Sequence, residues 1–260
     1  MPVVESEFDR VIRKDHIYAI NKEAQQVADR IAEKHALPDK IVLKITARPQ
    51  STGTHIDYAD WKIVIDYNAL SVQKALIERR ALRGLLAHEI MHMAQKLDGT
   101  EKEIIRLFTK SFRDRGLGKD RFELMKAMGM IAKDVFVNDA LIGEGFSEEL
   151  FKHYLILVHS RVKDNVLPFS ELTTDRFDDF FIALLGLFPS YVPFLRNGDA
   201  EKGGIIKSSI NWHFEDIPHE LRAGVAGVEA TLLGASLTEK GIEAFIESSL
   251  TWYSHLLSSS

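Results

Sequence analysis

The spacing of apolar residues changes along the first quarter of the chain. Over residues 16–35 apolar side chains recur every three or four positions, which is typical of one face of an amphipathic helix, and this stripe ends before Pro38. Residues 41–46 and 58–67 are instead rich in β-branched and aromatic side chains, and the polar segment 48–53 between them is typical of a turn or loop. The pattern therefore predicts a helix followed by a small sheet.

Helical spacing dominates the rest of the chain. The predicted helices span residues 71–77, 80–96, 101–113, 119–142, 147–162, 220–233 and 239–256. Between the fifth and the sixth of them, Pro189, Pro193, Asn197-Gly198 and Gly203-Gly204 are interpreted as loop residues. A few strands followed by a long run of helices indicates an α+β fold rather than a parallel sheet wound with alternating helices.

The most informative segment lies in the predicted helix 80–96, where residues 88–92 read His-Glu-Ile-Met-His. At about 100° per residue, this spacing brings His88 and His92 to one helix face, where both imidazoles can bind a single Zn²⁺. Glu89 then lies beside the metal as a candidate general base toward an attacking water. A random shuffle of this composition yields the H-E-x-x-H pattern only about 0.03 times. The alternative, a core helix whose histidines only form hydrogen bonds, would bury polar groups for no gain.

A catalytic zinc ion usually has three protein ligands and one open position, so a further ligand is expected. Asp98 lies ten residues after His88, at the offset of the third ligand in metzincins. Those proteins have glycine three residues after the second histidine, whereas this chain has Gln95. If the helix continues through residue 96, Asp98 lies about 9 Å beyond His92 along the axis and away from the ligand face.

Asp134 is the stronger candidate for the third ligand. It interrupts an apolar stretch of the predicted helix 119–142, where a carboxylate costs free energy unless it is paired, hydrogen-bonded or bound to a metal. Asn138 lies one turn further along the same face. Asp139 and Glu144 remain alternatives.

These motifs resemble those of the zincin-like metallopeptidases. In the gluzincin arrangement, H-E-x-x-H on one helix is completed by E-x-x-x-D on a second, whose first residue is a ligand and whose second supports a histidine. Here Asp134 stands in place of the Glu and Asn138 in place of the Asp. The variant A-x-D-x-x-V-N-x-x-L over residues 132–141 is similar to that of predicted cytosolic metallopeptidases of bacteria and archaea, and the resemblance covers residues 61–141.

The resemblance implies a small antiparallel sheet packed on an active-site helix, with the remainder mostly helical. It implies a metallopeptidase core over residues 1–145 and a mainly helical C-terminal part over 146–260. It also implies that substrate lies along an edge strand before the motif helix, and residues 58–67 occupy that place in order. An oxyanion-stabilising residue is expected as well. The candidates are His153, Tyr154, His213, His219 and Arg222.

Composition narrows the classes of function. The chain has 260 residues and no cysteine, which excludes disulfides, thiolate nucleophiles and Cys-ligated zinc. A net charge of −5 argues against a nucleic-acid-binding surface, although residues 79–83 contain three arginines. The N-terminus lacks the basic and apolar regions of a secretory signal, and the apolar run 180–188 is far shorter than the ~20 residues of a membrane span. We therefore expect a cytoplasmic protein with no membrane partner.

The leading hypothesis is zinc-dependent hydrolysis of a bond in a peptide or protein substrate. Peptide deformylase is a rival within enzymes, but the familiar family takes a ligand from cysteine, which is absent here. A non-catalytic, zinc-containing binding or regulatory protein is a rival of another class, and a structural metal site has no need of Glu89. A protease of DNA-bound proteins would be expected to carry a basic accessory region, which the C-terminal part lacks.

Overall fold

A computed structural model describes residues 1–47, 54–57, 60–115, 122–161, 169, 176–215, 217–234 and 238–259. The chain divides into two compact units. Unit 1 comprises residues 1–100 and 140–160, and unit 2 comprises residues 101–139 and 161–260. Each unit is therefore built from two separate stretches of the chain.

Unit 1 contains a sheet of four strands and the helices that surround it. Its elements are β1 (Val3–Phe8), α1 (Lys14–Ala32), β2 (Lys40–Thr46), β3 (Thr54–Asp57), β4 (Lys62–Asp66), α2 (Leu70–Ile77), α3 (Arg79–Leu97) and α6 (Ser147–Arg161). The strand order is β1-β2-β4-β3. The β1/β2 and β2/β4 pairs are parallel, whereas the β3/β4 pair is antiparallel.

The sheet is mixed, so the predicted mainly antiparallel sheet is wrong. β1 was not predicted, because its Glu and Ser residues obscure a short strand that is largely exposed. Helix α1 crosses from β1 to β2 and so makes that pair parallel, as a helical crossover does. β3 reverses the chain between β2 and β4, so these two also run in the same direction.

The predicted edge strand 58–67 corresponds to an inner strand. Residues 58–59 lie outside the described part, and the remainder of the segment contains β4, which pairs with β2 on one side and β3 on the other. The outer strand on this side is β3. A peptide adding to the sheet here would pair with β3, because only an edge strand has free main-chain groups.

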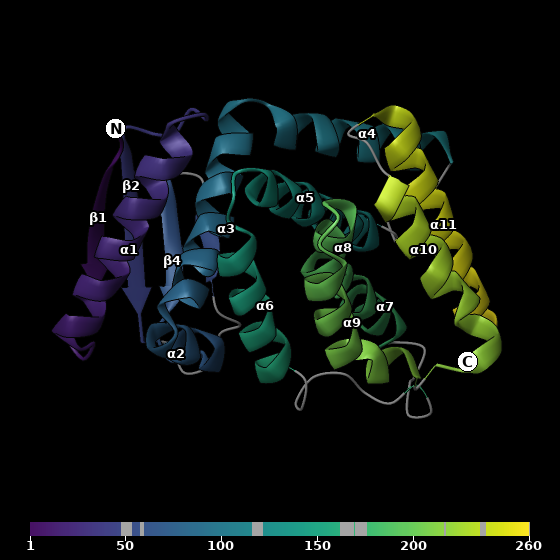
Figure 1. The fold of residues 1–260 in the computed structure, drawn as a ribbon. Coiled ribbons are helices and arrows are strands. Elements are labelled where there is room, and N and C mark those ends of the chain that lie inside the picture. Colours follow the sequence, from purple (N-terminus) through teal and green to yellow (C-terminus); the bar gives the residue numbers. More distant parts are fainter. Residues whose placement is uncertain are drawn as a thin grey trace. The chain divides into compact units, whose positions relative to one another are not determined.

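One face of the sheet forms the core of unit 1. Ile41, Leu43 and Ile45 of β2, and Ile63 and Ile65 of β4, are completely buried on the same face, as the two-residue period of a strand requires. The amphipathic helix α1 packs with its apolar stripe against this unit's core and contacts both β1 and α3 (Figure 1). The predicted helix 16–35 is thereby confirmed.

In the described residues of unit 2, helices joined by short turns are the regular secondary structure. Its elements are α4 (Thr100–Asp114), α5 (Phe122–Gly143), α7 (Phe177–Leu185), α8 (Phe188–Arg196), α9 (Ala200–Glu215), the 3-10 turn η4 (His219–Leu221), α10 (Ala223–Gly234) and α11 (Glu239–Ser259). Helix α5 begins in unit 2, and its last turn from Ala140 belongs to unit 1. The α+β class holds, with a small sheet and a mostly helical remainder.

The interpretation of the segment around Pro189 to Gly204 as loops is wrong. Pro189 lies in the first turn of α8, where a missing N–H costs nothing, and Pro193 lies inside this short helix. Gly203 lies within α9, where a Cβ would be 2.6 Å from Leu195 Cδ2, so glycine permits close packing between α8 and α9. Only Gly198, with φ of +79°, ends a helix as expected.

Among the described residues, one segment has the length and composition of a membrane span, Phe177–Arg196. It is mostly buried and is broken into α7 and α8. Apolar helices of this kind form the core of soluble proteins. The segment is therefore consistent with a soluble protein.

Candidate metal centre

Helix α3 carries the histidine motif and is buried on most of its surface. Its N-terminus is capped by Glu78, whose carboxylate accepts a hydrogen bond from the Arg80 N–H at 3.2 Å. No proline interrupts the run to Leu97. Glu89 and His92 are buried at 7% and 5% exposure, and His88 is half-buried. Histidine side chains buried in such a helix are placed as metal ligands are, away from bulk water.

The two histidines converge on one point. Their Nε2 atoms lie 3.1 Å apart, and their rings meet edge to face at 89° with centroids 4.6 Å apart. Two nitrogens bound to one tetrahedral zinc ion at about 2.0–2.1 Å would be about 3.3 Å apart. The observed geometry therefore fits a pair of ligands on a single ion, as the four-residue spacing predicts.

Two neighbouring helices hold α3 in place within unit 1. The Arg83 guanidinium donates to the carboxylate of Glu23 in α1, and a second donor reaches Gln26 Oε1 at 3.3 Å. On another side, Gly84 lies against α6, where a Cβ would be 2.2 Å from the Glu149 carbonyl oxygen. Gly84 was not identified from the sequence as a packing residue, although a glycine inside a strongly helical segment indicates such a close approach.

Asp134 lies on α5, six residues before Ala140, where this helix enters unit 1. It is half-buried, and the neighbouring Val135 and Val137 are completely buried. One ligand atom from each of His88, His92 and Asp134 lies within 4.8 Å of the others. The grouping contains the three residues that the sequence selected as metal ligands.

Glu144, an alternative third ligand, has other partners in unit 1. Its carboxylate lies 2.6 Å from Lys34 Nζ and 3.6 Å from His35 Nε2, both at the end of α1. The hydrogen bond from Lys34 holds the pKa of the Glu144 carboxyl below its usual value, and His35 acts in the same direction. Glu144 also ends α5, because Gly145 has a φ of +83° and the Phe146 N–H reaches back to the Leu141 carbonyl.

Asp139 and Asp98 are likewise engaged elsewhere. Asp139 forms an ion pair with Arg196 at 2.9 Å and accepts a hydrogen bond from Asn197 Nδ2 at 2.9 Å. Burial raises the pKa of the Asp139 carboxyl, although Arg196 and Asn197 act in the opposite direction. Asp98 follows the last turn of α3 and accepts a hydrogen bond from the Thr100 N–H at 2.8 Å. Each has a role that needs no metal.

Asn138 anchors α5 within unit 2. It is completely buried, and its Nδ2 donates to the Pro189 carbonyl in α8 at 3.0 Å. The sequence suggested that Asn138 supports a histidine ligand. The observed hydrogen bond has a different role, because it fixes the rotation of the helix that carries Asp134.

The candidate oxyanion residues fall into two groups. His153 and Tyr154 are buried on α6 with ring centroids 5.0 Å apart, and the Cβ of His153 would be 2.9 Å from a Cβ at Gly84, one turn before His88. His213, His219 and Arg222 lie in unit 2. Arg222 donates to the carbonyls of Ile217 and Glu215, a local backbone role.

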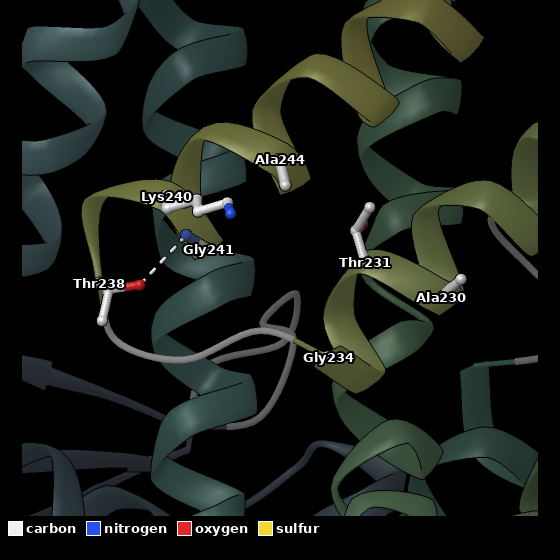
Figure 2. Close-up of a pocket in the computed structure, with 7 residues that line it drawn as sticks. All are labelled: Ala230, Thr231, Gly234, Thr238, Lys240, Gly241 and Ala244. Atoms are coloured by element: carbon white, nitrogen blue, oxygen red, sulfur yellow. Dashed lines mark hydrogen bonds between the residues drawn. The ribbon is translucent and has the colours of Figure 1, made fainter.

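A pocket of about 300 Å³ lies between α10 and α11 (Figure 2). Its polar groups come from Thr231, Thr238 and Lys240, and the Thr238 hydroxyl already accepts a hydrogen bond from the Gly241 N–H at 3.2 Å. The lining contains no His, Asp or Glu. It therefore offers none of the side chains that bind zinc in the absence of cysteine.

Comparisons with protein-family models, with curated proteins and with solved structures gave no match to this chain. The case for a function therefore depends on the residues and their geometry. The group of potential metal ligands formed by His88, His92 and Asp134 is the feature with the most specific chemistry.

Proposed function

We propose that this protein is a zinc-dependent metallopeptidase of the zincin-like type. The observation that carries the proposal is the convergence of the His88 and His92 Nε2 atoms, 3.1 Å apart on a buried helix that also carries Glu89. Asp134 would complete the ligand set, since its carboxylate belongs to the same group of ligand atoms. Two histidines and one carboxylate leave a fourth position open, as catalytic zinc sites require.

The zinc ion would polarise the scissile carbonyl and make a water molecule more acidic. The Glu89 carboxylate would accept a proton from the attacking water and deliver it to the nitrogen of the leaving amine. His88 and His92 would take part as neutral imidazoles, each binding through Nε2.

A peptide substrate would bind along β3. This strand is at the edge of the sheet and contacts α3, so an added strand would pass beside the metal-binding helix. Main-chain hydrogen bonds to β3 would hold the substrate in an extended conformation, and these bonds depend little on the substrate's sequence. His153 and Tyr154 on α6 are proposed as the groups nearest to the reacting carbonyl, because α6 packs against α3 at Gly84. A cytoplasmic location is part of the proposal.

The test compares wild type with Glu89→Gln on a peptide library and measures bound zinc in both. We expect equal zinc content and a loss of hydrolysis of about 10²-fold or more, because Glu89 is a base and not a ligand. Equal turnover by the two proteins would contradict a catalytic role for Glu89. A wild type that binds zinc tightly but cleaves nothing would favour the second candidate, a zinc-containing binding or regulatory protein.

A further inference from the structure

The three parallel strands of unit 1 have their carboxyl ends on the same side of the sheet. The residues at these ends lie outside the histidine motif 88–92. β1, β2 and β4 lie side by side (Figure 1). Thr46 and Asp66 are the last residues of β2 and β4, and Asp9 directly follows β1. Thr46 and Asp66 are paired in register. The Asp9 N–H donates to the Ile45 carbonyl at 3.2 Å, which extends the β1/β2 ladder by one residue and places Asp9 opposite Thr46.

All three side chains lie on the same face of the sheet. Ile45 and Ile65 are completely buried against the helices, so their successors Thr46 and Asp66 belong to the opposite face. Phe8 is paired with Ile45, so Asp9 belongs to that opposite face too. The strand ends thus present a row of carboxylate, hydroxyl and carboxylate. The Asp9 Oδ2 accepts a hydrogen bond from the Ala47 N–H at 2.8 Å, which holds this row together.

Two oxygens in the row are buried without a hydrogen-bond partner among the described residues. Asp66 is 3% exposed, and while its Oδ1 accepts from the Asn68 N–H at 3.0 Å, its Oδ2 has no donor. Thr46 is 7% exposed, and its Oγ1 has no partner either. An unsatisfied carboxylate oxygen inside a protein carries a large desolvation cost. A bound cation would remove that cost.

We propose that Asp9, Thr46 and Asp66 form a binding site for an oxygen-ligated divalent cation of the Ca²⁺ or Mg²⁺ class. Neighbouring strands are about 4.8 Å apart, so the backbones that carry the two carboxylates are about 9.6 Å apart, one on either side of the central hydroxyl. Both aspartate side chains would lean toward Thr46 to bind one ion. Two carboxylates and a hydroxyl are hard oxygen ligands, which these cations prefer, and water would complete the coordination. The site shares no residue with the proposed zinc site, which uses His88, His92 and Asp134.

Lys44 provides the main competing explanation. It lies on the same face, two residues before Thr46 in β2, and it is half-buried. An ammonium reaching Asp66 would satisfy the carboxylate without any metal. The experiment must therefore distinguish a bound cation from this internal charge.

The experiment titrates Ca²⁺ and, separately, Mg²⁺ into the zinc-loaded full chain by calorimetry, with thermal unfolding as a second measurement. We expect one equivalent to bind and to raise the melting temperature. Asp66→Asn and Asp9→Asn should each weaken binding tenfold or more, because each removes a charged ligand. Asp60→Asn is the matched control, since Asp60 is an exposed carboxylate in the turn before β4, and it should bind as wild type does.

Three results would overturn the proposal. The first is no binding of either ion up to about 10 mM, beyond the weakest class of protein calcium sites. The second is binding that both aspartate variants leave unchanged. The third is that the wild type binds no cation and Lys44→Met lowers its stability. Lys44 would then be the partner of Asp66. If Asp66→Asn does not fold, cation binding by Asp9→Asn alone tests the proposal, because Asp9 is exposed and its substitution should not prevent folding.

Discussion

Gly84 in α3 lies so close to Glu149 in α6 that a Cβ on the glycine would be 2.2 Å from the Glu149 carbonyl oxygen. Because that oxygen belongs to the backbone of a helix, it cannot move aside as the end of a flexible side chain could. The close approach occurs one helical turn before His88. The position of the histidine pair therefore depends on the packing of α6.

We predict that Gly84→Ala destabilises the protein by about 1–3 kcal/mol, the usual cost of adding a methyl group to a well-packed interior. It should also weaken zinc binding, because α3 or α6 must shift. Denaturant unfolding and a zinc titration measure the two effects. Gly204→Ala is the control: Gly204 lies inside α9 with no atom within 4 Å of an added Cβ, so this change should gain about 0.5–1 kcal/mol. Equal effects of the two substitutions would contradict the packing argument.

The pair between Arg83 and Glu23 holds α3 to α1, and Glu23 is 1% exposed. We predict that Arg83→Met costs about 2–3 kcal/mol, because it leaves a buried carboxylate without its counter-ion. The value is below that of a fully buried pair, since the Arg83 side chain is 37% exposed. Arg80→Met, which changes an exposed arginine on the same helix, should shift stability by less than about 0.5 kcal/mol. Unfolding free energies of the two variants test this difference.

The ion pair of Glu144 with Lys34 should make stability depend on pH. The folded-state pKa of Glu144 is lowered from its usual 4.5, so its contribution is present above that value and is lost as pH falls through the lower folded pKa. We therefore expect Glu144→Gln to be less stable than wild type at pH 7, and the difference to shrink as pH falls below about 4.5. Unfolding curves at a series of pH values provide the measurement. A difference independent of pH would exclude this linkage.

Local patterns predicted the helices better than the sheet. The boundaries of α1 lie within three residues of the expected ones and those of α3 within one, because the apolar period of a helix can be read from its own sequence. Strand pairing depends on segments far apart in the chain. β1 pairs with β2 only because α1 brings the chain back beside β1. The sequence of residues 3–8 does not indicate this pairing.

For the candidate site, too, the sequence predicted the local features and not the contacts between distant segments. The spacing of His88 and His92 follows from one helical turn, so their convergence was predictable from the sequence. The choice among acidic residues for the third ligand was not. Glu144 and Asp139 are paired with Lys34, in the turn after α1, and Arg196 in α8, partners that no local pattern around α5 reveals.

The identity of the third ligand gives the most discriminating prediction about the proposed metal site. We expect His88→Ala combined with His92→Ala to abolish zinc binding, and Asp134→Ala to weaken it by about tenfold or more, because each change removes a direct ligand. Glu89→Gln should leave the zinc content unchanged. Zinc content after dialysis and competition with a chelator measure these affinities. Zinc retained in full stoichiometry by the double histidine variant would place the metal elsewhere in the chain.

Asp139→Asn and Glu144→Gln are the matched controls for Asp134→Ala. Each removes a carboxylate near the end of the same helix, yet each carboxylate is already paired with a cationic side chain. Both variants should therefore lose stability through their broken ion pairs while binding zinc as wild type does. If Asp134→Ala retained wild-type affinity and one of the controls lost it, that control would identify the third ligand. The ion pair seen at that residue would then have to break when zinc binds.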